Sequence, residues 1–381
     1  MSDLMVLFRA GNSTIYRILL AGRIVSQTFG KKLSPILVSV WFISLRIAMI
    51  IPMALDGVFF SGLRSTYITS PIIIVGNPRT GTTFLQRFLC DNQFGAGLQL
   101  YRMVYPSLII QTLITPIIPW LEAISPAKYH KTSAHKTDLE SIETDDVSLL
   151  FRYFDGFFLY GFILAHAQKD YTTLFDPTLR DTSTRDFDWL EKLWKRSLVF
   201  TGQKRIVAKL FSAGLRMQTL LDRFPDARIL YMVRDPIAVI PSAMSLITGV
   251  LDRAYGFWDL PKERRNLYLE RLYVALVGLL SGFQEDWTKG QFDQSRIHIV
   301  HYDRMMYDFE GVMRGVCDFT GHAATPEQLL QIRLMADQQR AYKSEHHYDL
   351  ERFGLDADRI RRDTAGFTEL FIDSKMTASS C

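Results

Sequence analysis

The stretch IIIVGNPRTGTTFLQRFL, from Ile72 to Leu89, decides the fold expected of this 381-residue chain. Its first four residues are β-branched and are bounded by Pro71 and Gly76, a pattern typical of a short buried strand. After Gly81 the apolar residues recur at helical spacing. The stretch therefore predicts a strand, a glycine-bounded loop and a helix in direct succession.

The loop between this strand and this helix has the composition of an anion-binding site. The first amides and the dipole of a helix favour a negative charge, and Gly76 and Gly81 let the backbone approach such an anion closely. Arg79 adds a planar fork suited to a phosphate or a sulfate. Further hydroxyl donors come from three threonines, Thr80, Thr82 and Thr83. The alternative interpretation is a tight turn whose polar residues hold no ligand.

The two glycines of the loop have the G-x-x-x-x-G spacing of a phosphate-binding loop, but no lysine follows them. A nucleotide-hydrolysing loop places a lysine after its second glycine, where it reaches the outer phosphates, and then a hydroxyl that holds magnesium. Thr82 occupies the lysine position here. This difference argues against an ATPase or a kinase.

A second succession of strands and helices lies in RIVAKLFSAGLRMQTLLDRFPDARILYMVRDPIAVIPSAMS, residues 205–245. Strands are expected at residues 206–210 and 229–233, with a helix between them for which Ser212 is a suitable cap. A last strand is expected in RIHIVHY, residues 296–302. Strands that alternate with helices in this way predict an α/β fold with a parallel sheet.

A second anion site is expected where the strand 229–233 ends. Arg234 lies at the C-terminal end of this strand, and parallel sheets bind their ligands at that edge. Pro236 then opens a helix, for which proline is a good first residue. Ser242 lies eight residues after Arg234, about two turns into that helix. Together, an arginine and a hydroxyl can bind a second phosphate.

The charge and the cysteine content exclude some classes of protein. The net charge is only +4, which gives no basic field for nucleic acid. The cysteines are scattered and have no metal-ligand spacing, so they favour a reducing compartment over a disulfide framework; they are Cys90, Cys317 and Cys381. We therefore expect a cytoplasmic protein with no nucleic-acid partner and no metal.

Hydrophobic residues make up 48% of the chain, and the surplus lies in three segments. Residues 33–60 carry only two charged residues, residues 103–121 carry none, and residues 151–164 are rich in aromatic side chains. Arg46 and Pro52 are expected to interrupt the first segment as a membrane-spanning helix. Because basic residues dominate the N-terminal region, we predict that it lies on an anionic membrane surface. A buried core helix and a single membrane span are the alternatives.

These motifs together resemble the sulfotransferases that use 3′-phosphoadenylyl sulfate (PAPS). VGNPRTGTTFL looks like the 5′-phosphosulfate loop of that family, and RDPIAVIPS looks like its 3′-phosphate site. VHYDRMMYDFEGVMRGVCDFTG is similar to the family's tyrosine-bearing loop and helix, and HHYDLERFGLDADRI to the C-terminal tail of its bacterial-type members. The resemblance implies a P-loop-like, three-layer α/β/α fold with a central parallel sheet. An apolar N-terminal helical extension and a helical insertion or lid would be added to it.

The resemblance also assigns roles to the two anion sites. The residues implied at the 5′-phosphosulfate of PAPS are Arg79, Thr80, Gly81, Thr82 and Thr83. Those implied at its 3′-phosphate are Arg234 and Ser242. Sulfuryl transfer leaves the product PAP intact, so the loop needs neither the magnesium site nor the lysine of a nucleotide-hydrolysing loop.

Lys209 matches a lysine that, in many members of the family, steadies the oxygen that leaves the sulfur. The alternative is a solvated lysine at the end of a strand. This chain departs from the family beside it, because many relatives continue with Ser-Pro or Asn-Pro, whereas Leu210, Phe211 and Ser212 stand here. Contacts to the acceptor near Lys209 are therefore not implied by the resemblance.

The general base that takes the proton of the acceptor hydroxyl has two candidates. SAHKTDLESIETDDVSLLF, residues 133–151, resembles a segment of the family that ends in an acidic pair. Glu143 matches its best-placed glutamate, and His135 is the rival because histidine titrates near neutral pH. The alternative is that these acids are the solvated start of a helix, where Asp and Glu are favoured.

The acceptor is expected to be hydrophobic. The apolar segments 103–121 and 151–164 fall between the two donor motifs, where insertions can reach over the ligand edge of a parallel sheet. Apolar walls suit a lipid, an isoprenoid or a sterol-like alcohol better than a sugar. The alternative is that both segments are core helices.

The sequence thus predicts a PAPS-dependent sulfotransferase that acts on a hydrophobic or lipid-like hydroxyl. A carbohydrate sulfotransferase and a non-catalytic or kinase-like phosphate-binding protein are the alternatives. The expected organisation is an N-terminal membrane-associated region (1–68), a sulfotransferase domain (69–370) with a helical acceptor-side insertion (101–200), and a tail (371–381).

Overall fold

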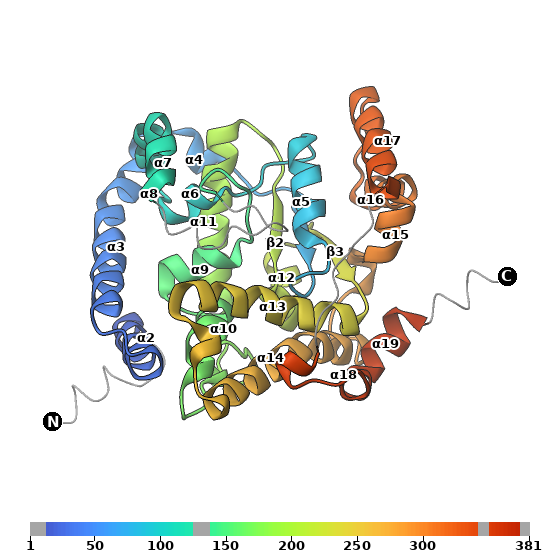
Figure 1. Ribbon diagram of the computed structural model, residues 1–381. Coiled ribbons are helices and arrows are strands. Elements are labelled where there is room, and N and C mark those ends of the chain that lie inside the picture. The colour runs from blue at the N-terminus through green and yellow to red at the C-terminus, as the bar shows by residue number, and fades with distance from the viewer. Residues whose placement is uncertain (1–12, 125–137, 342–349, 374–381) are drawn as a thin grey trace. The chain divides into compact units, whose positions relative to one another are not determined.

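The computed structural model describes residues 13–124, 138–341 and 350–373, which form two compact units (Figure 1). The first unit comprises the described parts of Met1–Thr66, Leu98–Phe200 and Leu246–Leu272. The second unit comprises the described parts of Tyr67–Gly97, Thr201–Ser245 and Tyr273–Cys381. Three of the described helices contribute residues to both units: α13 (Pro236–Tyr255), α14 (Lys262–Thr288) and, by its last residue alone, α11 (Ser183–Thr201).

The second unit is built on a four-stranded sheet in which every pair of neighbouring strands is parallel, in the order β2-β1-β3-β4. Its strands are β1 (Ile72–Val75), β2 (Val207–Leu210), β3 (Arg228–Val233) and β4 (Ile297–His301). All residues of β1 and β2 are buried, as strands covered on both faces require. The expected parallel sheet and its strands are confirmed.

Helices cover both faces of this sheet. The helical elements that lie wholly in the second unit are α5 (Thr82–Asp91), η5 (Ser212–Arg216), α12 (Met217–Arg223), η7 (Gln294–Arg296), α15 (Tyr302–Tyr307), α16 (Phe309–Thr320), α17 (Pro326–Ala341), η8 (Glu351–Phe353), α18 (Ala357–Asp363) and α19 (Ala365–Phe371). The resulting three layers confirm the fold class expected from the sequence.

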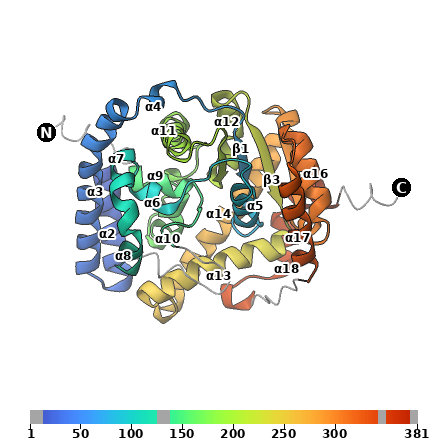
Figure 2. The ribbon, with the colours of Figure 1, turned by 90° about the horizontal axis from the view of Figure 1, so that it is seen from above.

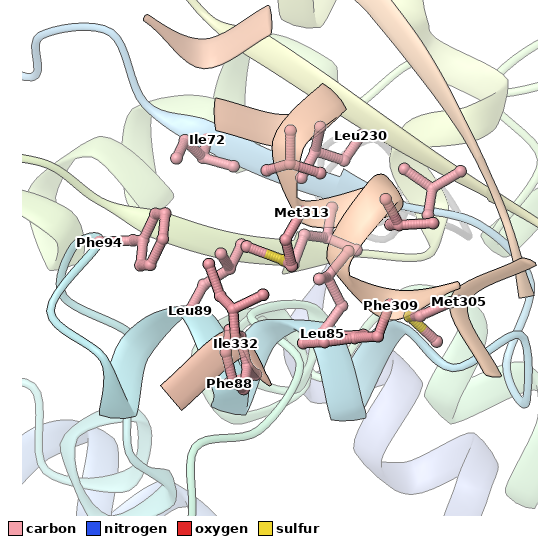
Figure 3. Packing of buried hydrophobic residues seen from close by; sticks show 14 of the residues in the cluster. Ile72, Leu85, Phe88, Leu89, Phe94, Leu230, Met305, Phe309, Met313 and Ile332 are labelled. Carbon is pink, nitrogen blue, oxygen red and sulfur yellow. The ribbon is translucent and has the colours of Figure 1, made fainter. Parts of the chain in front are cut away.

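Alternation along β3 distributes the core between the two faces. Leu230 joins a cluster with Leu85 and Phe88 of α5 and with Met313 of α16, which Figure 3 shows packed together. Tyr231 points the other way and stacks on Phe283 of α14, with 3.6 Å between the ring centroids. Burial of this apolar surface is the main contribution to the stability of the unit.

One helix start differs from the expectation. Ser212 begins a 3₁₀ turn, and α12 starts only at Met217, after Arg216, without a side-chain cap. The hydroxyl of Ser212 instead accepts a hydrogen bond of 2.7 Å from the Arg216 guanidinium. The expected cap was therefore wrong, because a nearby buried arginine needed an acceptor.

The described part of the first unit consists mainly of helices. They are α2 (Thr14–Phe29), α3 (Leu33–Phe59), α4 (Gly62–Ser65), α6 (Leu100–Val104), α7 (Leu108–Ile114), η1 (Thr115–Ile117), α8 (Ile118–Ile124), α9 (Asp146–Tyr153), α10 (Phe157–Phe162), η3 (Leu164–His166), η4 (Thr172–Leu174), α11 (Ser183–Thr201) and η6 (Phe257–Asp259). α2 is fixed by Arg17, which is fully buried and donates to the carbonyl oxygens of Tyr153 and Phe154 at 2.8 Å. Burial lowers the pKa of Arg17 to about 10, and the neighbouring Asp155 opposes that shift.

α3 is one continuous helix, although Arg46 and Pro52 were expected to interrupt it. Proline removes one backbone N–H and strains one turn. The helix continues because Phe42, Met49 and Asp56, at intervals of seven residues, are all buried and hold both halves of α3 against the same unit. Among the residues that the structure describes, two helices, α3 and α13, are long and apolar enough to cross a membrane. The most apolar 18-residue stretch of α3 is 11% buried within the protein, and that of α13 is 56% buried.

His166 supplies a prediction about stability and pH. It is 8% exposed, stacks on Tyr268 at 4.0 Å, and has no hydrogen-bond partner on either ring nitrogen in the described structure. Burial lowers its pKa from 6.5 to about 3. Unfolding therefore takes up a proton below pH 6.5, so stability is full above that pH and falls as the pH is lowered toward 3.

His166→Phe is expected to remove about 2–3 kcal/mol of this loss of stability between pH 6.5 and 4.5. Denaturant unfolding of both proteins across this range tests it, and equal slopes would contradict it.

Candidate functional site

The loop after β1 takes a shape that only glycine permits at its two ends. Gly76 has φ of 146°, and a Cβ atom there would lie 2.8 Å from the carbonyl oxygen of Met232. Gly81 has φ of 87°, and a Cβ atom there would lie 2.8 Å from side-chain atoms of both Tyr302 and Met305. The loop therefore runs close to β3 and α15, as a backbone cradle for an anion requires.

The interior of the loop is braced by Asn77, which the sequence analysis did not single out. Its side chain donates to the carbonyl oxygen of Leu276 in α14 at 2.9 Å, and its own carbonyl accepts from the Thr80 hydroxyl at 2.8 Å. Thr80 is 1% exposed. In this structure the Thr80 hydroxyl fixes the shape of the loop, and its contact with a ligand stays a prediction.

The N-terminus of α5 faces the loop without a side-chain cap. Gly81 is its cap residue and offers no side-chain acceptor for the first amides. Such a helix start carries unpaired N–H groups and the positive end of the helix dipole, which together favour an anion. Thr82 and Thr83 are the first two residues of α5, so their hydroxyl groups stand beside those amides.

Arg79 joins the two predicted anion sites. It has φ of 76°, an unfavourable value for a residue with a side chain, and such strain is typical of functional loops. Its Nε donates to the Ser242 hydroxyl at 2.9 Å, and its carbonyl oxygen accepts from Nη1 of Arg234 at 2.9 Å. The residues assigned to the 5′- and 3′-ends of a nucleotide therefore lie in direct contact.

Tyr302 holds Arg234 in place, a role that sequence reasoning missed. The Arg234 guanidinium lies 4.0 Å from the centre of the Tyr302 ring, within the range of a cation–π interaction. Tyr302 is the first residue of α15, directly after β4. The sequence could have indicated this role, because Tyr302 lies in the segment VHYDRMMYD, directly after the last strand.

Lys209 is not a solvated lysine. It lies in β2, is 1% exposed, and its Nζ donates to the Thr83 hydroxyl at 2.9 Å. A buried ammonium group needs hydrogen-bond acceptors or a counter-charge, and the loop brings both an acceptor and an expected anion to it. Lys209, Arg79 and Arg234 thus supply the cationic side chains of one site in the second unit.

Glu143 belongs to the first unit and lies three residues before Asp146, the first residue of α9. Its backbone N–H donates to the carbonyl oxygen of Leu98 at 3.2 Å. Glu143, Asp145 and Asp146 are all buried, which contradicts the alternative of a solvated helix start. Asp145 accepts from the Trp194 indole at 3.2 Å. The rival base, His135, lies outside the described residues. The choice of base stays a prediction.

Among the described residues, no group of three or more His, Cys, Asp or Glu side chains could hold a metal ion. The donor groups that the loop does offer are amides, hydroxyls, a lysine and two arginines, which bind anions rather than cations. The cradle formed by the two glycines and the uncapped start of α5 fits the phosphosulfate group of PAPS.

Comparison with known proteins gives both a family and a fold. The model of the sulfotransferase family matches residues 71–326. The chain is 26% identical over 329 residues to omega-hydroxy-beta-dihydromenaquinone-9 sulfotransferase Stf3 of Mycobacterium tuberculosis. The aligned region covers 78% of this chain and 79% of that protein. The protein of the same name from Mycobacterium bovis matches equally.

Two solved structures share the fold. Sulfotransferase STF9 from Mycobacterium avium superposes with a TM-score of 0.72 at 15% identity, over 96% of this chain and 98% of that one. Sulfotransferase STF1 from Mycobacterium tuberculosis gives a TM-score of 0.65 at 16% identity, over 93% and 91%. The family model spans residues 71–326, which include the glycine-bounded loop after β1 of the parallel sheet. The chain therefore belongs to the sulfotransferase family.

Proposed function

We propose that the protein transfers a sulfuryl group from PAPS to the hydroxyl of a hydrophobic, lipid-like acceptor, so that PAP and a sulfate ester are released. The observation that carries this proposal is the contact of Arg79 with Ser242 and Arg234 beside the uncapped start of α5. A ligand with a single phosphate group would need only one of these two sites. A nucleotide with anionic groups at both its 5′- and 3′-positions would occupy both.

Each group at the site then has a defined role in binding the donor. Amides at the start of α5 and the hydroxyls of Thr82 and Thr83 bind the 5′-phosphosulfate, while Arg234 and Ser242 bind the 3′-phosphate. Neutralising these anions lets the loop hold the donor without a metal ion.

Transfer requires a new bond between the acceptor oxygen and sulfur while the bond from sulfur to the bridging oxygen breaks. Negative charge grows on that bridging oxygen, and Lys209, held against Thr83 in the loop, is placed to stabilise it. The proton of the acceptor hydroxyl passes to a general base, for which Glu143 is our choice and His135 the rival.

The hydrophobic acceptor rests on two further grounds. The relative Stf3 is named for an omega-hydroxylated dihydromenaquinone, which is a lipid with a terminal hydroxyl. The first unit also contains two apolar segments, 103–121 and 151–164, parts of which are not fully buried. A cytoplasmic protein peripherally associated with a membrane would meet such an acceptor where it dissolves.

The acceptor can be tested with a charge in each apolar segment. Ile110→Asp and Phe158→Asp alter half-buried positions of α7 and α10. If these side chains line the acceptor site, both variants should keep PAP affinity and melting temperature but lose transfer to a long-chain alcohol by about 100-fold. Sulfate transfer from labelled PAPS is measured with a lipid extract and with free oligosaccharides. Efficient transfer to an oligosaccharide, with none to any lipid, would overturn the acceptor and leave the donor unaffected.

A further inference from the structure

The outward face of α3 is apolar along its length. The exposed apolar residues on this face are Leu33, Ile36, Leu37, Val40, Ile47, Ile51, Leu55 and Val58. With 3.6 residues per turn they fall within a sector of about 100° and so form one stripe on the helix. Ile47 is 63% exposed and Ile51 is 69% exposed, values that oppose the usual pattern of a water-facing helix.

The opposite face of α3 carries its two charged residues. Arg46 and Asp56 share this inward face with Phe42 and Met49, half a turn away from the apolar stripe. Arg46 is half-buried, and desolvation together with the nearby Arg152 lowers its pKa. α3 therefore keeps its two charged residues on the inward face and is apolar outside, which is the reverse of a soluble surface helix.

Asp56 attaches this inward face to the unit. Its carboxylate is fully buried and accepts from the Ser107 hydroxyl at 2.8 Å and from the backbone amides of Leu108 and Ile109 at 3.1 Å. It also pairs with Nε of Arg196 at 2.9 Å. A membrane-spanning α3 would have to break this network and place the charge of Arg46, at the middle of the helix, in hydrocarbon. The contacts favour a helix that stays flat on its unit.

Two neighbouring segments, α2 and the run from α7 to α8, extend the apolar surface. Leu113, Ile117 and Trp120, from α7, η1 and α8, are exposed, and Ile15 and Leu19 form the outward stripe of α2. α2 and α7 both pack on α3. Figure 2 shows α2, α3, α7 and α8 gathered on one side of the first unit. Exposed apolar side chains gathered on neighbouring helices mark an interaction site.

The exposed charges of α2, α3 and the residues that flank them all have the same sign. Between residues 13 and 66 the exposed charged side chains are Arg23, Lys31, Lys32 and Arg64, and the single acid, Asp56, is buried. Two copies of this surface would bring like charges together. An anionic bilayer offers both an apolar interior for the stripe and negative headgroups for the basic residues.

We propose that the outward face of α3, with α2 and the α7–α8 segment, lies in the plane of an anionic lipid bilayer and is inserted to the depth of its headgroups. Basic residues attract the protein to the surface, and the stripe through Ile47 and Ile51 holds it there. This proposal does not rest on the sulfotransferase activity, because it concerns a surface of the first unit and needs no donor.

Flotation with vesicles tests the surface. Full-length protein is expected to float with vesicles of phosphatidylcholine and phosphatidylglycerol, and to be released by detergent more completely than by salt. Ile47→Asp with Ile51→Asp should lower the partition coefficient by at least about 100-fold, because both side chains enter the bilayer. The matched control, Leu330→Asp with Leu334→Asp, changes two exposed leucines of α17, 55% and 46% exposed, and should float like the wild type. Equal loss in both pairs would overturn the proposal.

A charge variant separates the contribution of the basic residues. Lys31→Glu with Lys32→Glu changes two exposed side chains that precede α3. Binding to anionic vesicles should fall by about 10-fold or more, and binding to neutral vesicles should be unchanged. PAP affinity and melting temperature show that each variant is folded. A wild-type protein that binds neither kind of vesicle would overturn the proposal.

Two further measurements exclude the other uses of α3. Fluorophores on Lys32→Cys and on Ser61→Cys, two exposed positions that flank α3, should both be quenched by an external aqueous quencher in the vesicle-bound protein, in a chain whose other cysteines are replaced. Protection of one label only would mean that α3 spans the bilayer. A wild-type dimer that Ile47→Asp with Ile51→Asp converts to a monomer would mean that a second copy covers the stripe. Either result would overturn the proposal.

Discussion

Arg234→Ala is expected to weaken PAP binding by about 2–4 kcal/mol, a loss of roughly 30- to 700-fold in affinity. The guanidinium would contact the 3′-phosphate directly, and it also braces the carbonyl oxygen of Arg79 in the loop. The variant therefore loses a charge-assisted contact and the support of a strained residue. Isothermal titration with PAP measures the effect, with ATP as the competing ligand.

The controls separate this contact from a general loss of charge. Arg333→Ala removes an exposed arginine of α17 in the same unit and should bind PAP like the wild type. Ser242→Ala removes one neutral hydrogen bond and should cost about 0.5–1.5 kcal/mol. Unchanged PAP affinity in Arg234→Ala, ATP that binds as well as PAP, or a strict need for a divalent metal would each contradict the proposed donor site.

Glu143→Gln is expected to lower turnover by about 100-fold or more, with little change in PAP affinity. The substitution keeps the size of the side chain and its capacity for hydrogen bonding but removes its ability to take a proton. Steady-state sulfation with labelled PAPS measures turnover, and the pH profile should lose its acidic limb. Glu143 is buried, so melting temperature must be recorded alongside.

Asp145→Asn is the matched control for this buried acidic segment. Its carboxylate accepts from the Trp194 indole, so the change should lower stability while the folded protein keeps its turnover. If His135→Ala abolishes turnover and Glu143→Gln is normal, the base is His135. If Asp145→Asn loses turnover and Glu143→Gln keeps it, the base is instead Asp145.

The sequence predicted the strand-loop-helix unit well because its signals are local. Four β-branched residues bounded by Pro71 and Gly76 can bury both faces only as a central strand, and β1 is that strand. The two glycines were correctly expected at the ends of the loop, where their φ angles of 146° and 87° exclude other residues. Pro236 likewise opens α13 as expected.

Two features were not predictable in the same way. Ser212 had the right side chain for a helix cap, but the guanidinium of Arg216, four residues further along the chain, takes its hydroxyl. Pro52 had the right chemistry to break α3, but burial of Phe42, Met49 and Asp56 along one face outweighs the lost hydrogen bond. The first outcome was decided by a competing local partner, and the second by tertiary contacts that no local pattern records.

The partners within the loop were also hidden from the sequence. Arg79 was expected at the 5′-phosphosulfate, yet its guanidinium contacts Ser242, which is 163 positions away. Tyr302 stacks on Arg234 from a different strand-helix connection. Motif spacing indicates which residues gather at a sheet edge, but the side-chain conformations that join them arise only after the sheet has formed.

Arg79 makes the two ends of the site thermodynamically linked. Under the proposed function, the Ser242 hydroxyl accepts from Arg79 and donates its own hydrogen to the 3′-phosphate, so that the bound phosphate orders the residue that holds the Arg79 guanidinium. A nucleotide that lacks the 3′-phosphate does not supply this contact to Ser242 and leaves Arg79 less firmly held. Selectivity for the complete donor over its 3′-dephosphorylated analogue then arises from cooperativity between subsites, in addition to the direct contact that the analogue lacks.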